Sequence, residues 1–464
     1  MPCDVDALTR EAAALFQFVK GIAEYSHGYE VAHLPANQSF LSYLRKLAVR
    51  TERCLPELVE TIREDPEFSA VIRPVFSGIR AFWSSLHRFV KPIQDAHTLY
   101  IPSPLIQSLE HLAQRIPGLK GSRFVVFHTL DVNYYRLRNA NLKKRCDGFA
   151  SIIGFEEPFP EKHALIGVPY SLAPTLFSNV LIAHEIGHFA FEEVSIADQL
   201  ADKIDKALQE VFGERLRDMT ESDRGWCVDR LRAWSEEIFC DRLAIALAGP
   251  VFSFAFLEFL DISGVSDPAD EVQFAASHPS DACRFHAHLD QIKSQGWWER
   301  LRVAAPEITK TITWLSEIEP TKYVYADEQK AELAPKCLAA FLGLLPAIKE
   351  VVATTAAECT ANYNDEVCLD LDAVSEALAQ GVVPSTVVYK ECVRRIEARG
   401  ILNGAYFFYL CELDRLTRHV KSPDRDAVSL RAFWLEKIEM WTLKALEDDH
   451  LRWLKEEYGG TSAA

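Results

Sequence analysis

The chain has 464 residues, of which 48% are hydrophobic, so it is long enough to bury a sizeable core and to form more than one structural unit. Its 67 acidic and 50 basic residues leave a net charge of −17, which argues against a nucleic-acid partner, because such a partner needs a basic face. Its 11 cysteines are scattered without a C-x-x-C pair, which predicts reduced thiols in a cytosol-like compartment.

The first 120 residues are predicted to be helical. Apolar residues recur at helical spacing in 12–22, 40–47 and 71–90. The N-terminal sequence MPCDVDALTREAA is polar and acidic, so no secretory signal is expected. Residues 1–120 are therefore predicted to form an N-terminal helical region.

The composition changes after residue 121, where runs rich in β-branched and aromatic residues predict short strands. These runs are 123–130 (RFVVFHTL), 149–155 (FASIIGF) and 163–170 (HALIGVPY). A small sheet at this point would offer an edge with which an extended peptide can pair.

The run 172–193 (LAPTLFSNVLIAHEIGHFAFEE) is predicted to form one amphipathic helix that carries an H-E-x-x-H pattern. Residues four apart share one face of a helix, so the imidazoles of His184 and His188 can reach a single metal ion. Glu185 can then face a water on that ion. Such polar residues within an apolar run are costly to bury unless a ligand satisfies them. A chance occurrence of this short pattern is the alternative.

A third metal ligand is expected from a later helix. The extension H-E-x-x-H-x-x-G-x-x-H is absent, because Val194 stands at its last position. A second helical run, 227–248, carries Glu237 and Asp241 one turn apart, where two carboxylates repel unless a cation and an imidazole N–H relieve them. Glu237 is the predicted third ligand, and Asp241 the carboxylate that orients a ligand histidine. A solvated acidic face is the alternative interpretation, and the alternative ligands are Glu236, Glu192 and Glu193.

The segment 277–284 (SHPSDACR) is predicted to begin a helix at Pro279, with His278 as the capping residue. A histidine near the positive end of a helix is favoured in its neutral form, which can donate a hydrogen bond to an oxyanion. Arg284, on the same helix, could stabilise that oxyanion directly or could bind a carboxylate. A capping histidine and a surface arginine are the alternative interpretation.

Beyond residue 306 the chain is again predicted to be helical, to about residue 458. Breaks are expected near 381–384, 400–404 and 422–424, where glycine, proline or serine occurs.

Two apolar stretches, 243–260 and 337–348, are the longest in the chain. The first is interrupted by Gly249 and Pro250, and the second is too short to span a bilayer. Both are therefore predicted to be buried core helices, with a membrane-associated hairpin at 243–260 as the alternative. We expect a cytoplasmic protein without membrane association.

Three motifs, HEIGH, EIFCD and HPSDACR, resemble those of the gluzincin metallopeptidases, and in particular of the family of CAAX prenyl proteases and bacterial heat-shock membrane proteases. The resemblance covers roughly residues 160–295. The residues that it implies are the zinc ligands His184, His188 and Glu237, the general base Glu185, the outer carboxylate Asp241, and His278 and Arg284 near the substrate. Members of that family commonly have transmembrane helices, which are not evident here, and carry alanine where this chain has Cys240.

Together these features predict an α+β, mainly α-helical protein. A zincin-like core at 121–295, in which a small sheet precedes the HExxH and ExxxD helices, is flanked by helical regions at 1–120 and 296–464. The predicted function is hydrolysis of peptide bonds in a protein or peptide, with one Zn²⁺ per chain and Glu185 as base. A zinc hydrolase of a non-peptide amide and a catalytically silent zinc-binding interaction protein are the alternatives.

Overall fold

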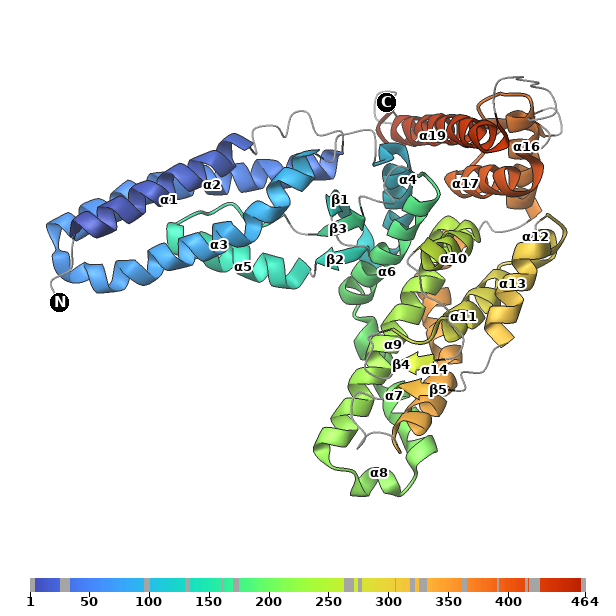
Figure 1. The fold of residues 1–464 in the computed structure, drawn as a ribbon, viewed down its shortest axis with the longest axis horizontal. Coiled ribbons are helices and arrows are strands. Elements are labelled where there is room, and N and C mark those ends of the chain that lie inside the picture. The colour runs from blue at the N-terminus through green and yellow to red at the C-terminus, as the bar shows by residue number, and fades with distance from the viewer. Residues whose placement is uncertain are drawn as a thin grey trace. The chain divides into compact units, whose positions relative to one another are not determined.

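A computed structural model describes most of the chain. The described residues are 5–25, 34–95, 101–129, 134–137, 139–160, 162–169, 175–262, 271–273, 278–304, 306–317, 322–324, 332–360, 365–389, 392–413, 416 and 426–459. They form a mainly α-helical protein with a small β-sheet, which confirms the predicted α+β class (Figure 1). The chain divides into two compact units, Met1–Ser103 with Gly121–Pro174, and Pro104–Lys120 with Thr175–Ala464. The division into 1–120, 121–295 and 296–464 stays a prediction.

In the first unit, long amphipathic helices pack against one another. They are α1 (Val5–Tyr25), α2 (Pro35–Glu64), α3 (Ser69–Asp95) and α5 (Asn139–Ile153), with the 3-10 helix η2 (Pro66–Phe68) between α2 and α3. Apolar side chains at helical spacing, such as Phe40, Leu44 and Trp83, are fully buried. The predicted N-terminal helices are confirmed.

The first unit also contains a three-stranded sheet in the order β1-β3-β2. Strand β1 (Arg123–Thr129) runs parallel to β3 (His163–Pro169), and β2 (Tyr135–Leu137) runs antiparallel to β3. The outer edge of β1 is partly closed by Asn37 of α2, whose Nδ2 donates to the Val126 carbonyl at 2.8 Å and whose Oδ1 accepts from the Val126 N–H at 3.1 Å. This side-chain amide takes the place of a neighbouring strand, so an extended peptide cannot pair with β1 at Val126.

The predicted strand at 149–155 is wrong, because this segment is the end of helix α5. A short apolar run fits either a strand or a buried helix, and here the helical spacing decides. The helix ends before Gly154, which has a φ of 63° that favours glycine. The buried side chains of α5 that follow this spacing are Leu142, Cys146, Phe149, Ala150 and Ile153.

The second unit is built from the remaining helices and two short strand pairs. The helices are α4 (Ser103–Gln114), η3 (Pro117–Leu119), η4 (Ser178–Leu181), α6 (Ile182–Glu193), α7 (Ile196–Phe212), α8 (Arg215–Asp218), α9 (Glu221–Ala248), α10 (Val251–Ile262), α11 (Asp281–Ser294), α12 (Trp298–Ala304), α13 (Pro306–Glu317), α14 (Ala334–Thr355), α15 (Ala357–Thr360), α16 (Asp365–Ala379), α17 (Ala398–Phe407), the π-helical segment η6 (Phe408–Glu412) and α19 (Ala427–Gly459). Strand β4 (Glu271–Gln273) pairs with β5 (Lys322–Val324) in parallel, and β6 (Thr386–Tyr389) pairs with β7 (Cys392–Arg395) in antiparallel fashion.

Helix α9 is the centre of the second unit, since α6, α11 and α14 all pack against it. It begins after Thr220, whose hydroxyl accepts from the Asp223 N–H, and ends at Gly249, where φ is 84°. The predicted end at Gly249 is confirmed. The helix that carries HEIGH is shorter than predicted, because η4 precedes it and α6 starts only at Ile182.

One helix of the described chain, α14, is long and apolar enough to cross a membrane by length and composition alone. The same composition suits a buried core helix, and α14 packs against α7 and α9. The rings of Trp234 on α9 and Phe341 on α14, for example, meet edge to face at 5.2 Å. The other apolar stretch, 243–260, is divided between α9 and α10 at Gly249.

Two of the three predicted breaks near the C-terminus can be compared with the structure. The break at 381–384 is confirmed by Gly381, whose φ is 70°. The break at 400–404 is wrong, because these residues lie inside α17. A Cβ at Gly404 would lie 2.6 Å from the Cβ of Val374 on α16, so this glycine permits close helix packing. The segment 422–424 lies outside the described residues.

Candidate metal centre

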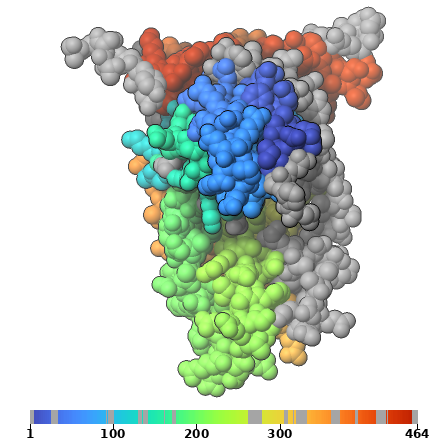
Figure 2. All heavy atoms as spheres, turned by 90° about the vertical axis from the view of Figure 1, so that its left-hand side faces the viewer, coloured from blue at the N-terminus to red at the C-terminus, as the bar shows by residue number. Residues whose placement is uncertain are grey.

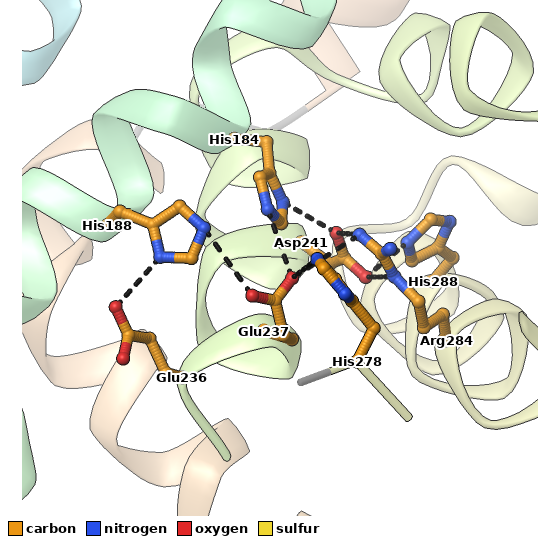
Figure 3. A network of polar contacts seen from close by, with 8 residues as sticks. All are labelled: His184, His188, Glu236, Glu237, Asp241, His278, Arg284 and His288. Atoms are coloured by element: carbon orange, nitrogen blue, oxygen red, sulfur yellow. Dashed lines mark hydrogen bonds and ion pairs between the residues drawn. The ribbon is translucent and has the colours of Figure 1, made fainter. Parts of the chain in front are cut away.

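Helices α6 and α9 approach each other most closely where Gly187 meets Cys240. A Cβ at Gly187 would lie 2.7 Å from the Cα of Cys240 and 3.2 Å from its carbonyl oxygen, so only glycine fits. This contact places the histidines of HEIGH opposite the carboxylates of EIFCD, on facing sides of the two helices (Figure 3).

The two histidines both face the Glu237 carboxylate, each nearest to a different oxygen of it. The Nε2 atom of His184 lies 3.3 Å from Oε2 of Glu237, and the Nε2 atom of His188 lies 3.6 Å from Oε1 (Figure 3). Zinc holds nitrogen and oxygen ligands at about 2.0–2.2 Å, so two ligands at tetrahedral positions lie about 3.4 Å apart. The observed distances therefore have the size of the edges of a zinc tetrahedron.

Each histidine is oriented by a carboxylate behind it. The Nδ1 of His184 donates to Asp241 at 2.8 Å, and the Nδ1 of His188 donates to Glu236 at 2.8 Å. A carboxylate only accepts, so both Nδ1 atoms carry a proton and both Nε2 atoms point to Glu237. Glu236, one of the alternative ligands, thus contacts Nδ1 of His188, on the side of the ring away from Glu237. Glu192 and Glu193, at the end of α6, are not part of the network in Figure 3.

Asp241 is the hub of a fully buried network. Arg284 of α11 donates to it twice, from Nε at 2.7 Å and from Nη2 at 2.6 Å. His288, one turn further along α11, lies 3.1 Å from Asp241 through its Nε2. Of the two predicted roles of Arg284, the structure shows the contact with a carboxylate. His288 is not among the candidate residues taken from the sequence; its position four residues after Arg284 was the available signal.

His278 is the exposed member of the cluster. Its Nε2 lies 3.4 Å from Oε2 of Glu237, while 55% of its side chain is exposed. The predicted capping role is wrong, because α11 starts at Asp281 and Ser280 caps it by accepting from the Cys283 N–H. Burial lowers the pKa of His278, although Glu237 acts in the opposite direction. The neutral form is therefore favoured, as expected, but through burial.

Without a metal ion, the charged side chains of the cluster form a network of buried ion pairs. Burial disfavours the charged form of His184, yet its bonds to Asp241 and Glu237 outweigh this and raise its pKa to about 10. Burial also opposes the charge of Glu237, but His184 lowers its pKa to about 2. Arg284 holds the pKa of Asp241 well below its usual range against the same effect of burial. A metal ion at this point must displace the proton on His184.

Two further carboxylate features fit a cation. Oε2 of Glu237 is buried and accepts no hydrogen bond of normal geometry from the described residues, although Nε2 of His184 lies 3.3 Å and Nε2 of His278 lies 3.4 Å from it. Glu185 is 5% exposed, and its carboxylate forms no hydrogen bond or ion pair within the described part of the chain. The donor set His184, His188 and Glu237 therefore suits zinc, and Glu185 remains available to accept a proton.

Cys240 is a further candidate ligand, which was not among the ligands predicted from the sequence. Its side chain is fully buried, and its sulfur and one ring nitrogen each of His184 and His188 lie within 4.8 Å of one another. Burial and the surrounding carboxylates, Glu237 foremost, raise the pKa of this thiol well above its usual value. A metal ion would be needed to make it a thiolate.

Comparisons of the chain with protein-family models, with curated proteins and with solved structures gave no match. The resemblance to the gluzincin metallopeptidases rests on the three short motifs and on the residues that carry them.

Proposed function

We propose that the protein is a zinc-dependent hydrolase that cleaves peptide bonds, with His184, His188 and Glu237 as the ligands of one Zn²⁺. The observation that carries this proposal is the convergence of two Nε2 atoms on the Glu237 carboxylate at 3.3 and 3.6 Å. Both rings are held in the ligand tautomer by carboxylates. The zincin-like core of the prediction, and a cytoplasmic location, belong to the same proposal. None of the described cysteines forms a disulfide, which favours a reducing compartment.

The protein's own residues supply the remaining chemistry. Zinc, when bound, lowers the pKa of its water to about 7 and polarises a carbonyl. Glu185 accepts the proton of the attacking water and passes it to the leaving amine. His278, half exposed beside Glu237, donates a hydrogen bond to the oxyanion from its neutral ring. Arg284 acts through Asp241, which it fixes with two hydrogen bonds, and thereby orients His184.

The test of this proposal is the variant Glu185→Gln in zinc-loaded protein. We expect zinc to bind in unchanged stoichiometry and cleavage to fall by about 10²–10⁴-fold, because the base is lost and the ligands are kept. Cleavage is measured by mass spectrometry on a peptide library, and zinc by elemental analysis. Glu193→Gln, an exposed glutamate on the same helix, is the matched control and keeps full activity. Equal cleavage by zinc-loaded Glu185→Gln and parent protein would refute the assignment of the base.

A second candidate function is favoured by Cys240. A thiolate from this residue, added to His184, His188 and Glu237, gives zinc four protein ligands, and such closed sites are structural. The protein would then be a catalytically silent zinc-binding protein. The Co²⁺-substituted protein distinguishes the two functions, since a thiolate ligand gives a charge-transfer absorption in the near ultraviolet that Cys240→Ala removes. Cys227→Ala, which removes another fully buried thiol of α9, is the control.

A further inference from the structure

The first unit contains a groove of about 900 Å³ between helices α3 and α5. The two helices lie side by side (Figures 1 and 2). The rings of Phe82 on α3 and Phe149 on α5 stack across the contact at 3.8 Å. Small-molecule sites typically have volumes of about 300–1,000 Å³ and mostly apolar walls with few polar groups, which describes this groove. The apolar side chains along it include Ile79, Phe82, Leu86, Phe89, Leu142 and Phe149.

Two arginines supply the charge along the groove. Nη1 of Arg145 on α5 lies 3.5 Å from the Ser85 hydroxyl on α3, so this guanidinium reaches across the groove. Arg88 lies one helical turn after Ser85, on the same side of α3, and stacks over the ring of Phe89 at 4.6 Å. Both arginines are exposed, and neither forms an ion pair with a carboxylate of the described residues.

The charge of these two helices is opposite to that of the chain. Helix α3 carries four basic residues and one acidic residue, and α5 carries three basic residues and one acidic residue. The whole chain has a net charge of −17. A local excess of positive charge around an apolar groove is complementary to a ligand with a negative head and an apolar body.

We propose that this groove binds a long-chain anionic amphiphile of the fatty-acid class. The acyl chain lies against the apolar walls, and its carboxylate lies between Arg88 and Arg145. The apolar walls match an acyl chain, and a carboxylate matches the guanidinium groups, which donate in pairs. This site is independent of the metal centre and makes no use of its ligands.

Gly78 provides the first test, because it lines the groove and a Cβ there meets no described atom within 4 Å. The variant Gly78→Leu places a branched side chain in the groove from a position with open space at its Cβ, and leucine favours the helix more than glycine does. We expect the full-length variant to bind a fluorescent C16 fatty acid at least about tenfold more weakly than the parent. Gly21→Leu in α1, where a Cβ likewise meets no described atom within 4 Å, is the control and binds as the parent does.

The arginines provide the second test. The double variant Arg88→Gln/Arg145→Gln should weaken binding of the fatty acid about tenfold and leave binding of the matching C16 alcohol unchanged. Arg73→Gln, an exposed arginine of α3 that does not line the groove, is the control. Equal affinity of the parent and Gly78→Leu for the fatty acid would overturn the proposal. Binding only to vesicles with anionic lipid, insensitive to Gly78→Leu, would also overturn it and make this face a membrane-binding surface.

Discussion

The candidate metal centre and the groove use charged residues in opposite ways. In the candidate metal centre, the buried charged side chains pair with one another. Asp241, for example, contacts His184, Arg284 and His288. In the groove, Arg88 and Arg145 are exposed and pair with no carboxylate of the described residues. A buried charge needs an oppositely charged or hydrogen-bonding partner within the protein, because it has lost its hydration. An exposed charge is hydrated and can pair with a ligand instead. Loss of a charge should therefore cost stability or metal affinity in the first region and only ligand affinity in the second.

The largest expected effect is that of Glu237→Ala on zinc. Loss of an outer partner of a ligand histidine costs about 10–100-fold in metal affinity, and loss of a ligand itself should cost more. We therefore expect Glu237→Ala to weaken zinc binding by more than 100-fold and Glu236→Ala by about 10–100-fold, measured by competition with a chelator. Glu236, which lies behind His188, is the matched control. Fatty-acid binding in the groove should be unchanged in both variants.

The same titration decides between Glu237 and Cys240 as third ligand. If Glu237→Ala keeps the affinity and stoichiometry of the parent while Cys240→Ala loses them, the site is a histidine–cysteine site and the proposed hydrolase is wrong. If Cys240→Ala keeps both, Cys240 is only the small residue that the contact with Gly187 requires.

The sequence predicted which side chains share a helix face in the candidate metal centre, because helical spacing is local. Two histidines four residues apart, and a glutamate and an aspartate four residues apart, share helix faces wherever the helices lie. The partner of each side chain was harder to predict. Glu236 and Glu237 are neighbours in the sequence, and the packing of α6 on α9 decides which one faces the Nε2 atoms.

The groove was not predicted, because neither of its two helices carries a sequence motif that indicates a binding site. The segment 149–155 was expected to form a strand, so Phe149 and Ile152 were not recognised as residues of a helix face. Arg88 and Arg145 lie 57 positions apart in the sequence, and only the packing of α3 on α5 brings them to one groove. The local excess of basic residues on α3 and α5 was the available signal.

An intermediate effect is expected from Gly187→Ala. Its Cβ would lie 2.7 Å from the backbone of α9, so the two helices must move apart, at a cost of about 1–3 kcal/mol in the free energy of unfolding. Zinc affinity should fall as well, because the ligands lie on both helices. Urea unfolding measures the first effect. Gly225→Ala is the control, since a Cβ at this position of α9 meets no described atom within 4 Å, and it should be neutral or stabilising by up to about 1 kcal/mol. Equal stability of Gly187→Ala and the parent would contradict the close contact.

The last prediction is a pH dependence that the two regions should not share. Bonds to Asp241 and Glu237, opposed by burial, raise the pKa of His184 to about 10, from about 6.5 in the unfolded chain. The folded state therefore holds a proton that the unfolded state releases, and this stabilisation is complete below pH 6.5 and is lost as the pH rises to about 10. In protein treated with a chelator, the free energy of unfolding should fall by up to about 1.4 kcal/mol per pH unit in this window.

His184→Gln, and zinc in place of the proton, should each remove this slope. Binding of the fatty acid should stay constant from pH 6.5 to 9, because arginine remains charged. A slope that persists in His184→Gln would assign the titration to another group.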